Sequence, residues 1–420
     1  MLGEIIAIGN ELTSGRIPNT TSGFAAHHLF EAGFDIYAMH TIGDTPELIG
    51  EALNRALGRV DFVLVTGGLG PTDDDLTTEA VSEALNRPTL PNLEILSLIR
   101  QHLDSNTEHP AGSLEKLAWL PEGAETLSPK TRMAGFQLVH NGKPIFFLPG
   151  IPHQMRTLLV EQVLPRLATW YDGKQLTSSQ KVFKIFGKTE LEINHIIKDL
   201  ALDDAVEIGY YPVFPDVHLS MTIRGGNKNK TDLLARNSSR LITDSLGSSI
   251  YGSDRDTMES VVGILLQKNN KKLAVAESCT GGLISHLITS VAGSSDYYLG
   301  GVTSYANSMK TSYLGVKEDL LIEHGAVSRE VAIAMAHGMR VQSNADLAIS
   351  VTGIAGPSGG SDDKPVGTVF IGLSEKNETT VQRFLFAENR YEIQRLTAQT
   401  ALDIVRHHLL QTETSYFHEN

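Results

Sequence analysis

The fold of this chain is decided first by the stretch Ala276-Glu277-Ser278-Cys279-Thr280-Gly281-Gly282-Leu283. The apolar run 273–276 leads into it, and a segment with helical apolar periodicity, 283–291, follows it. This order predicts a strand, a tight glycine turn and a helix. The N–H groups of such a turn and of the helix N-terminus can point at one anion. We therefore expect an anion-binding turn, with Ser278 and Thr280 within reach of a ligand.

Residues that can activate a hydroxyl follow in the same region. The segment 300–305 ends at Tyr305 and leads to Lys310. Serine is a poor nucleophile until a base removes its proton, and a desolvated lysine can be that base. Ser278, Lys310 and Tyr305 therefore form a predicted catalytic set that needs neither histidine nor metal. The alternative, a solvated Lys310 without a catalytic role, stays open.

Further candidates for substrate binding surround this set. A predicted strand ends at Thr352 and Gly353, and N–H groups of the glycine-rich turn that follows could hold an oxyanion or a phosphate. Ser295 either reaches the same pocket or only closes a helix. Arg390 and Arg395 flank the start of the last predicted helix. They either clamp a phosphate bidentately or are solvated helix charges.

Composition limits the classes of protein to consider. The 420 residues include 35 Lys and Arg against 49 Asp and Glu, a formal charge of −14, which favours neither nucleic acid nor an anionic membrane as a partner. The one cysteine excludes an intramolecular disulfide, and no apolar run approaches the ~18 residues of a membrane span. The N-terminus lacks the basic start of a signal peptide. We expect a cytoplasmic protein whose partners are small molecules.

The order of expected elements indicates three domains, at 1–171, 172–252 and 253–420. In the first, strands are expected at 4–8, 34–41, 61–66 and 144–148, and helices at 21–32, 46–57, 77–85 and 153–170. In the second, strands are expected at 182–187 and 217–224, helices at 190–200 and 233–246, and linkers at 172–174, 177–179 and 247–256. In the third, strands are expected at 273–276, 346–352, 367–373 and 382–387, and helices at 283–291, 330–341 and 391–410.

This alternation predicts an α/β fold. Alternating strands and helices are typical of parallel sheets covered by helices. We therefore expect two three-layer α/β domains with mainly parallel sheets, joined by a small α+β domain.

A second group of chemical residues follows the expected strand 61–66. Gly67 and Gly68 let the backbone approach a ligand, and the run Thr72 to Asp75 is rich in side-chain oxygens. Ligands of open α/β sheets lie at the carboxyl ends of strands, where Glu11 and Asp44 are also expected. Asp74, Asp75 and Glu11 could hold a divalent ion that bridges phosphates. The alternative is that the aspartates only cap the next helix.

With these motifs in order, the chain resembles the CinA (competence/damage-inducible protein) family over nearly its whole length. The N-terminal part is similar to the molybdopterin-binding fold of the MoaB and MogA proteins. The motifs that carry this likeness are Gly9-Asn10-Glu11, 66–72 with 74–77, and Leu148-Pro149-Gly150-Ile151-Pro152. The C-terminal part resembles the nicotinamide mononucleotide deamidase domain (PncC). Its motifs are 277–282, 300–302 with Tyr305, Asn307 and Lys310, 352–357 and Gly367-Thr368-Val369.

The resemblance implies hydrolysis of the carboxamide of nicotinamide mononucleotide to nicotinate mononucleotide and ammonia, without a cofactor. Ser278 stands at the position of the family's proposed nucleophile, Lys310 at that of its partner, and Tyr305 near the reacting amide. The positions implied to bind or orient the substrate are Thr280, Gly281, Gly282, Ser295, Thr352, Gly353 and Arg390. Whether Ser278 or Ser295 attacks is left open. The family also implies a homodimer.

For the N-terminal domain, the resemblance implies a metal-dependent ADP-ribose pyrophosphatase. Gly67, Gly68, Thr72 and Asp44 would line its nucleotide site, and Asp74, Asp75 and Glu11 would hold a divalent metal. The chain departs from the family pattern at Asn19-Thr20-Thr21, at Leu117-Ala118 and over 128–135. An active pyrophosphatase and a metal-binding but inactive site both remain open. A third alternative is a non-enzymatic partner protein with a relic pterin- or nucleotide-binding pocket.

Overall fold

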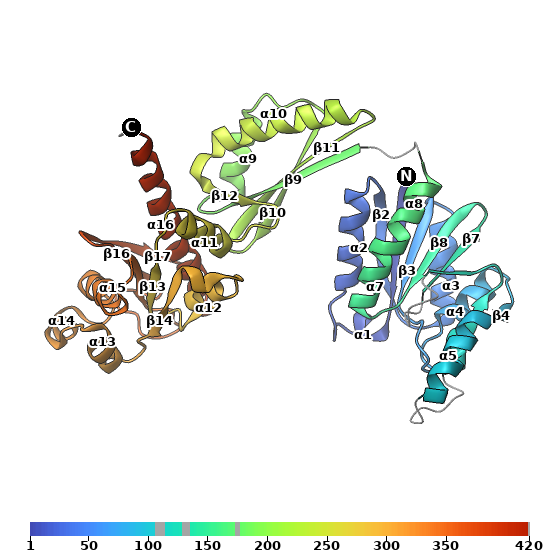
Figure 1. The fold of residues 1–420 in the computed structure, drawn as a ribbon, viewed down its shortest axis with the longest axis horizontal. Helices are drawn as coiled ribbons and strands as arrows, with labels where there is room; N and C mark the ends of the chain where they lie inside the picture. The colour runs from blue at the N-terminus through green and yellow to red at the C-terminus, as the bar shows by residue number, and fades with distance from the viewer. Residues whose placement is uncertain (106–113, 128–134, 173–176, 419–420) are drawn as a thin grey trace. The chain divides into compact units, whose positions relative to one another are not determined.

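A computed structural model gives the fold of residues 1–105, 114–127, 135–172 and 177–418 (Figure 1). Its contacts divide the chain into two compact units, each described by itself below. The first unit holds residues 1–180 and 223–235, and the second holds 181–222 and 236–420. The small α+β segment between the two larger sheets therefore does not form a unit of its own.

A six-stranded sheet forms the centre of the first unit. Its strands, in spatial order, are β2 (Asp35–Ile42), β1 (Leu2–Ile8), β3 (Phe62–Thr66), β8 (Lys143–Leu148), β7 (Phe136–His140) and β6 (Glu125–Thr126). The first four run parallel, β7 pairs antiparallel with β8, and β6 pairs antiparallel with β7. A separate hairpin pairs β4 (Thr89–Pro91) with β5 (Trp119–Pro121).

Helices cover both faces of this sheet, so the predicted three-layer architecture is confirmed. They are α1 (Asn10–Thr13), α2 (Thr20–Glu31), α3 (Pro46–Leu57), α4 (Thr77–Ala84), α5 (Leu93–Ser105), a 3₁₀ turn (Lys116–Ala118), α7 (Pro152–Leu158) and α8 (Leu164–Trp170). Neighbouring residues of β1 enter different cores: Ile6 packs with α3 and α4, whereas Ile5 packs with α2 and α7. A strand buried on both faces is apolar at nearly every position, as β3 is from Phe62 to Val65. The expected helix 153–170 contains a π-helical turn, Leu159–Val163, between α7 and α8.

The small α+β segment has a four-stranded sheet. Its strands, in spatial order, are β10 (Val206–Val213), β11 (Asp216–Gly225), β9 (Thr177–Ile185) and β12 (Ile250–Ser253). Its helices are α9 (Glu190–Lys198), α10 (Lys228–Leu246) and a 3₁₀ turn (Gly247–Ser249). The predictions of linkers at 177–179 and 247–256 were wrong, because these stretches lie in or include β9 and β12, which pair antiparallel. Strand β10 was not predicted. Hydrogen bonds between distant segments thus overrode the local glycine and serine content.

The C-terminal sheet has five strands. In spatial order they are β14 (Tyr298–Thr303), β13 (Leu273–Glu277), β15 (Leu347–Gly353), β16 (Thr368–Ser374) and β17 (Thr379–Leu385). The first three run parallel, and the last two are antiparallel. The helices are α11 (Met258–Lys268), α12 (Leu283–Thr289), a 3₁₀ turn (Ser294–Asp296), α13 (Asn307–Leu314), α14 (Glu318–His324), α15 (Arg329–Ser343) and α16 (Arg390–His418).

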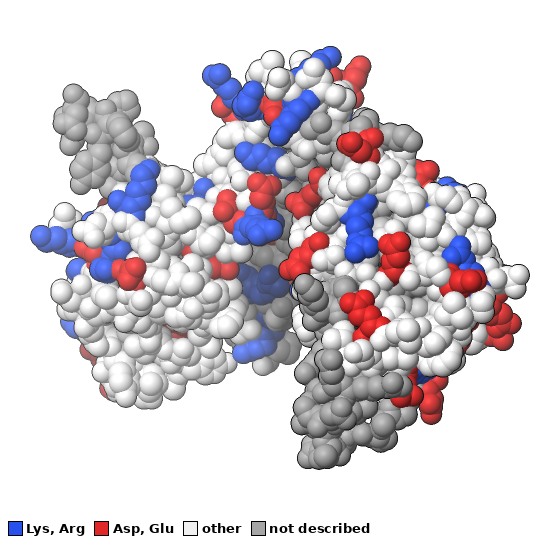
Figure 2. Space-filling model, turned by 45° about the vertical axis from the view of Figure 1, so that its right-hand side comes forward, with Lys and Arg blue, Asp and Glu red and all other residues white. Residues whose placement is uncertain are grey.

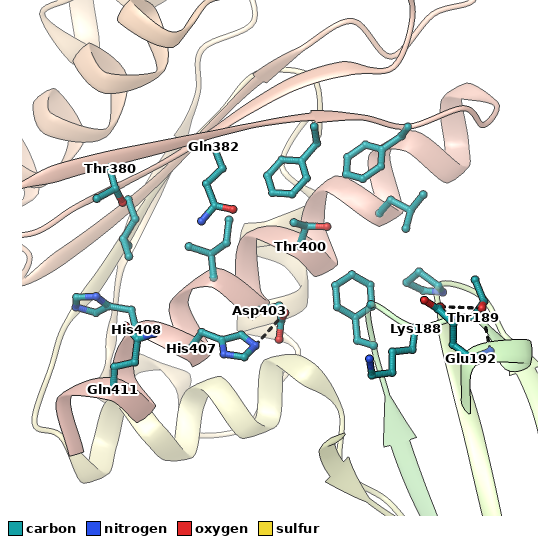
Figure 3. Close-up of a pocket in the computed structure, with 18 of the residues that line it drawn as sticks. Lys188, Thr189, Glu192, Thr380, Gln382, Thr400, Asp403, His407, His408 and Gln411 are labelled. Atoms are coloured by element: carbon teal, nitrogen blue, oxygen red, sulfur yellow. Dashed lines mark hydrogen bonds and ion pairs between the residues drawn. The ribbon is translucent and has the colours of Figure 1, made fainter. Parts of the chain in front are cut away.

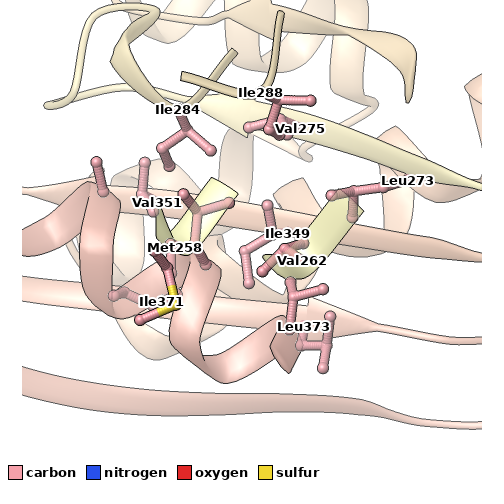
Figure 4. Close-up of a cluster of buried hydrophobic side chains, with 14 of the residues drawn as sticks. Met258, Val262, Leu273, Val275, Ile284, Ile288, Ile349, Val351, Ile371 and Leu373 are labelled. Carbon is pink, nitrogen blue, oxygen red and sulfur yellow. The ribbon is translucent and has the colours of Figure 1, made fainter. Parts of the chain in front are cut away.

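Both faces of this sheet are also covered. Figure 4 shows Met258 and Val262 of α11 and Ile284 of α12 among side chains of β13, β15 and β16, and the N-terminal half of α16 belongs to the same core. On the other face, Met335 of α15 packs with Leu314 at the end of α13. The domain is therefore a helix–sheet–helix sandwich whose central strands are fixed from both sides.

Charged side chains are interspersed over the face that Figure 2 shows, with neutral residues between most of them. Among the described residues, none of the helices combines the length and the apolar character that crossing a bilayer requires.

The N-terminus of α12 is satisfied by a side chain from the preceding strand. Glu277 is fully buried and accepts hydrogen bonds from the N–H groups of Gly282 (3.0 Å), Ile284 (3.1 Å) and Ser285 (2.9 Å), and from the Ser285 hydroxyl (2.7 Å). A carboxylate at a helix N-terminus is favoured both by these donors and by the helix dipole. Glu277 thus ties β13 to α12.

Replacing Glu277 by alanine should destabilise the C-terminal domain, because three N–H groups at the start of α12 and a serine hydroxyl lose their acceptor. We expect the free energy of unfolding to fall by about 2–4 kcal/mol. Urea unfolding followed by circular dichroism measures it. Glu318→Ala is the matched control, because Glu318 is an exposed acid in the first turn of α14. Its cost should stay below about 1 kcal/mol. Equal losses in the two variants would contradict a special capping role of Glu277.

Candidate active site

Three parallel strands of the C-terminal sheet end at one edge. Glu277 at the end of β13 pairs with Thr303 at the end of β14, and Ala276 pairs with Ser350 of β15. The next residues along each strand, Ser278 among them, therefore lie at the same level. The carboxyl edge of a parallel sheet is where ligands bind in open α/β folds.

Ser278 and Lys310 are in direct contact at this edge. The Lys310 Nζ lies 3.1 Å from the Ser278 Oγ and also donates to the carbonyl oxygens of Ser304 (2.6 Å) and Tyr305 (3.4 Å). Lys310 projects from α13 and is only 1% exposed. The Ser304 N–H donates to the Glu277 carbonyl at 2.7 Å, which fixes the end of β14 against β13. The alternative of a solvated Lys310 is therefore wrong.

Burial changes the protonation of Lys310. Desolvation disfavours the charged ammonium and lowers the pKa of Lys310 below its ordinary value of 10.5. The neighbouring Cys279 partly opposes this shift. At a given pH, a larger fraction of Lys310 is therefore the neutral amine, which can act as a base, than in a surface lysine.

A cavity of about 190 Å³ opens at this contact. Its lining residues are Ser278, Cys279, Tyr305, Lys310, Ala326, Val327, Thr352, Gly353, Ala355 and Arg390. Arg390 is exposed, and its guanidinium donates to the Gly356 carbonyl (2.7 Å) and to the Tyr305 hydroxyl (3.3 Å). Desolvation raises the pKa of the Cys279 thiol to about 12, so at neutral pH this thiol is not a nucleophile.

The structure thus brings together Ser278, Lys310, Tyr305, Thr352, Gly353 and Arg390. Thr352 is 1% exposed and donates to the Ala326 carbonyl at 2.8 Å, so its hydroxyl is already engaged on one side. The Ile354 N–H in the turn after β15 donates to the Thr368 carbonyl at 2.9 Å, which removes one of the amides expected for an anion. Arg395 is exposed and contacts Tyr391 on its own helix.

The turn itself differs from the predicted anion site. Gly281 (φ +63°) and Gly282 (φ +101°) adopt the left-handed conformation that the tight turn requires. The N–H of Gly282 and those of the first turn of α12 donate to Glu277, as described above. The predicted anion-binding role of this helix N-terminus was therefore wrong, because a buried carboxylate already fills it. Thr280 is 4% exposed, and its Oγ1 has no hydrogen-bond partner among the described residues.

Ser295 lies elsewhere in the domain. It is exposed in the 3₁₀ turn before β14, whose first residue, Tyr298, pairs with Leu273 at the beginning of β13. Ser278 follows the other end of that strand, roughly 15 Å away at about 3.3 Å per residue. Within this chain, therefore, the structure does not bring Ser295 to the cavity that holds Ser278.

Three functional features were not predicted from the sequence. The capping role of Glu277 could have been suspected from an acid just before a glycine turn and a helix. The carbonyl groups of Ser304 and Tyr305 leave no residue-type signal, because every residue carries a carbonyl. Nothing in the sequence marked Gln394, whose amide donates to the Cys279 carbonyl at 2.7 Å, as part of the site either.

In the N-terminal domain, the two predicted glycines form a tight turn with left-handed backbone conformation. Gly67 (φ +100°) and Gly68 (φ +63°) follow β3. A Cβ on Gly67 would lie 2.1 Å from the Ile8 carbonyl oxygen, and one on Gly68 would lie 2.2 Å from the Thr77 hydroxyl. The turn therefore needs glycine for close approach of β1 and α4, whatever ligand it meets.

The predicted metal residues mostly bind their own loops. The Thr72 Oγ1 lies 2.5 Å from both Asp74 and Asp75, and this hydrogen bond lowers the pKa of Asp74. The Lys116 ammonium donates to the carbonyls of Thr72 and Asp75. Asp44 accepts from the backbone N–H of Asn10, and Glu11 is exposed over Gly9.

A divalent metal therefore stays a prediction from the sequence. Over the described ranges, no three His, Cys, Asp or Glu side chains come together as a metal-binding group. As arranged, the Asp74 and Asp75 carboxylates lie against the Thr72 hydroxyl, and the Lys116 ammonium donates to carbonyls of the same loop, which does not fit a ready metal centre. Of the departures from the family pattern, 128–134 lie outside the described residues.

A larger cavity, of about 980 Å³, lies between the 186–192 region of the small segment and β16, β17 and α16 (Figure 3). Three of its carboxylates have partners: Glu192 accepts from the Thr189 N–H at 2.7 Å, Asp403 binds His407 and Arg406, and Glu375 lies 3.6 Å from His408. Its contact between a hydroxyl and a carboxylate, from Thr189 to Glu192 at 2.8 Å, belongs to the capping box of α9 and lies among exposed residues, unlike the buried contact at Ser278.

Comparison with known families matches almost the whole chain. Residues 255–409 match the CinA C-terminal domain, residues 4–169 match a probable molybdopterin binding domain, and residues 180–252 match the damage-inducible protein CinA KH domain.

Two relatives of similar length and one solved structure that spans about a third of the chain also match. A putative competence-damage inducible protein of Moorella thermoacetica is 38% identical over 96% of this chain and 97% of its own length. The crystal structure of a competence/damage inducible protein from Agrobacterium tumefaciens is 39% identical, covering 35% of this chain and 91% of that one, with a TM-score of 0.35. A CinA-like protein of Desulfotalea psychrophila is 59% identical over 97% of this chain and 99% of its own length. The two full-length relatives confirm the predicted resemblance, and the chain belongs to the CinA family.

Proposed function

We propose that the C-terminal domain is an amidohydrolase that converts nicotinamide mononucleotide to nicotinate mononucleotide and ammonia. The observation that carries the proposal is the 3.1 Å contact between the buried Lys310 amine and the Ser278 hydroxyl at the wall of a cavity. A hydroxyl nucleophile within hydrogen-bond reach of a base is the arrangement that acyl transfer needs. The choice of substrate comes from the family resemblance.

The surroundings of Lys310 suit a base. A neutral amine keeps two N–H groups and one lone pair. The carbonyls of Ser304 and Tyr305 accept the two N–H groups, and the lone pair then faces the Ser278 hydroxyl. Proton transfer from Ser278 to Lys310 would leave the alkoxide beside the cation that it has just formed.

In the proposed reaction, the Ser278 oxygen attacks the carboxamide carbon and Lys310 holds the released proton. The N–H groups of Cys279 and Thr280, which donate to no backbone carbonyl within the described part of the chain, are the nearest donors in sequence for the oxyanion. The intermediate collapses with loss of ammonia, which takes the proton from Lys310. Water then attacks the acyl-serine ester while Lys310 accepts a proton from it, and Lys310 gives this proton to the Ser278 oxygen as the carboxylic acid leaves.

The size and charge of the site support a nucleotide substrate. The cavity has a volume of about 190 Å³, whereas pockets that enclose a whole drug-sized ligand usually measure about 300–1,000 Å³. It suits a pyridine ring, with the remainder of the nucleotide at the rim. Arg390 stands at that rim with an exposed guanidinium, which suits a phosphate.

The alternatives draw less support. A metal-dependent ADP-ribose pyrophosphatase in the N-terminal domain would need Asp74 and Asp75 to leave Thr72. Burying a lysine costs free energy of desolvation, and a non-enzymatic partner protein would gain nothing from the buried contact between Lys310 and Ser278 in return.

Ammonia release from nicotinamide mononucleotide by the purified full chain tests the proposal. We expect Ser278→Ala and Lys310→Ala to lower kcat/KM at least about 1,000-fold, because each removes one half of the nucleophile–base pair. The matched controls are Ser290→Ala and Lys317→Ala, exposed residues outside the cavity lining, which should keep wild-type rates. Ser295→Ala decides between the two serines. Full activity of Ser278→Ala, or loss only in Ser295→Ala, would refute the assignment.

The lowered pKa of Lys310 gives the reaction a predictable pH dependence. The neutral amine is the active form, so kcat/KM should rise with pH through a pKa below 10.5 and then level off. Lys310→Arg should not restore activity at any pH, because guanidinium stays protonated. The measurement is kcat/KM from pH 5 to pH 10. A rate that falls as pH rises over this range would contradict a lysine base.

A further inference from the structure

The first turns of α16 lie against the catalytic edge. Arg390 lines the cavity, and Gln394, four residues later, is on the same face of the helix. Ile393 between them is fully buried in the domain core, as are Ala398, Ala401 and Leu402 further along. This half of α16 is therefore a rigid support from which the Arg390 and Gln394 side chains reach the site.

Gln394 holds the turn that carries the nucleophile. Its Nε2 donates to the Cys279 carbonyl oxygen at 2.7 Å. Cys279 follows Ser278 directly and is 5% exposed. On its other side, a Cβ on Gly353 would lie 3.1 Å from the Cys279 sulfur, so the end of β15 packs closely against the Cys279 side chain. The backbone after Ser278 is thus held at its carbonyl by α16 and at its side chain by β15.

We propose that Gln394 is a positioning residue for this active site. The peptide group between Cys279 and Thr280 is planar and trans, so its N–H points opposite to its carbonyl. By fixing the Cys279 carbonyl, Gln394 also fixes the direction of the Thr280 N–H and the backbone on which the Ser278 hydroxyl stands. Gln394 itself is not part of the described cavity lining and acts without touching the substrate. This inference rests on the proposed function and deepens it.

Two substitutions separate hydrogen bonding from packing. Gln394→Met keeps the length of the side chain and its packing but removes the donor. Gln394→Glu keeps the shape and places an ionised acceptor against the Cys279 carbonyl. The matched control is Gln399→Met on the same helix: the Gln399 amide donates to Asp216 at 2.9 Å and the residue is 8% exposed, so the change removes a similar bond away from the nucleophile.

Each variant of the full chain is measured in two ways. Steady-state ammonia release gives kcat and KM. The rate at which diisopropyl fluorophosphate phosphorylates Ser278, with loss of fluoride, reports nucleophile geometry without the nucleotide and is followed by mass spectrometry. We expect Gln394→Met to lower kcat and the labelling rate about 10- to 100-fold, since small misplacement of a reacting group can cost about 100-fold. KM should stay within about twofold, because uniform substrate binding is unchanged.

Gln394→Glu should be slower than Gln394→Met, and Gln399→Met should keep both rates within about twofold of wild type. Wild-type kcat and labelling in Gln394→Met would overturn the proposal, as would a raised KM with unchanged kcat. So would equal losses in Gln399→Met, because they would show a general effect of loosening α16. If the wild type labels at Ser278 but releases no ammonia, the proposed substrate fails, and the labelling ratios alone decide the role of Gln394.

Discussion

A buried amine loses its hydration water and needs fixed hydrogen-bond partners instead. At Lys310, these partners come from the residues at the carboxyl edge of the sheet. The carbonyls of Ser304 and Tyr305 can serve only because β14 ends beside β13, in the register that pairs Thr303 with Glu277. The Ser278 hydroxyl provides the third contact from the neighbouring strand end. Burial at this edge lowers the pKa of Lys310, which is what the proposed role as a base requires.

Two groups at this edge could each bind an anion: the N-terminus of α12 and the Arg390 guanidinium. The N-terminus of α12, the obvious candidate for a phosphate, already binds the Glu277 carboxylate. Under the proposed function, the positive charge for the substrate would come from Arg390, which lines the cavity at the beginning of α16. A buried carboxylate that caps a helix stabilises the turn beneath the nucleophile, whereas an exposed guanidinium can bind and release a ligand.

The N-terminal domain repeats the architecture without repeating the site. Gly67 and Gly68 follow a buried strand in a left-handed turn, as Gly281 and Gly282 follow β13. Here, however, the polar side chains of the loop, from Thr72 to Asp75, bond one another. Similar positions on a parallel sheet thus carry a buried contact between a lysine and a serine in one domain, and an acidic loop whose side chains hydrogen-bond to one another in the other.

The sequence by itself determined the α/β class, because continuous apolar runs and helical periodicity are local properties, and it determined the identity of Ser278, Lys310 and Tyr305 as candidates. The tertiary structure alone decided that Lys310 is buried, that Glu277 fills the helix N-terminus and that Ser295 lies at the other end of the sheet. It also showed that residues 177–179 and 250–253, which the sequence predicted as linkers, lie in strands. Burial, strand pairing and the choice of hydrogen-bond acceptor depend on segments far apart in the chain, and no local pattern records them.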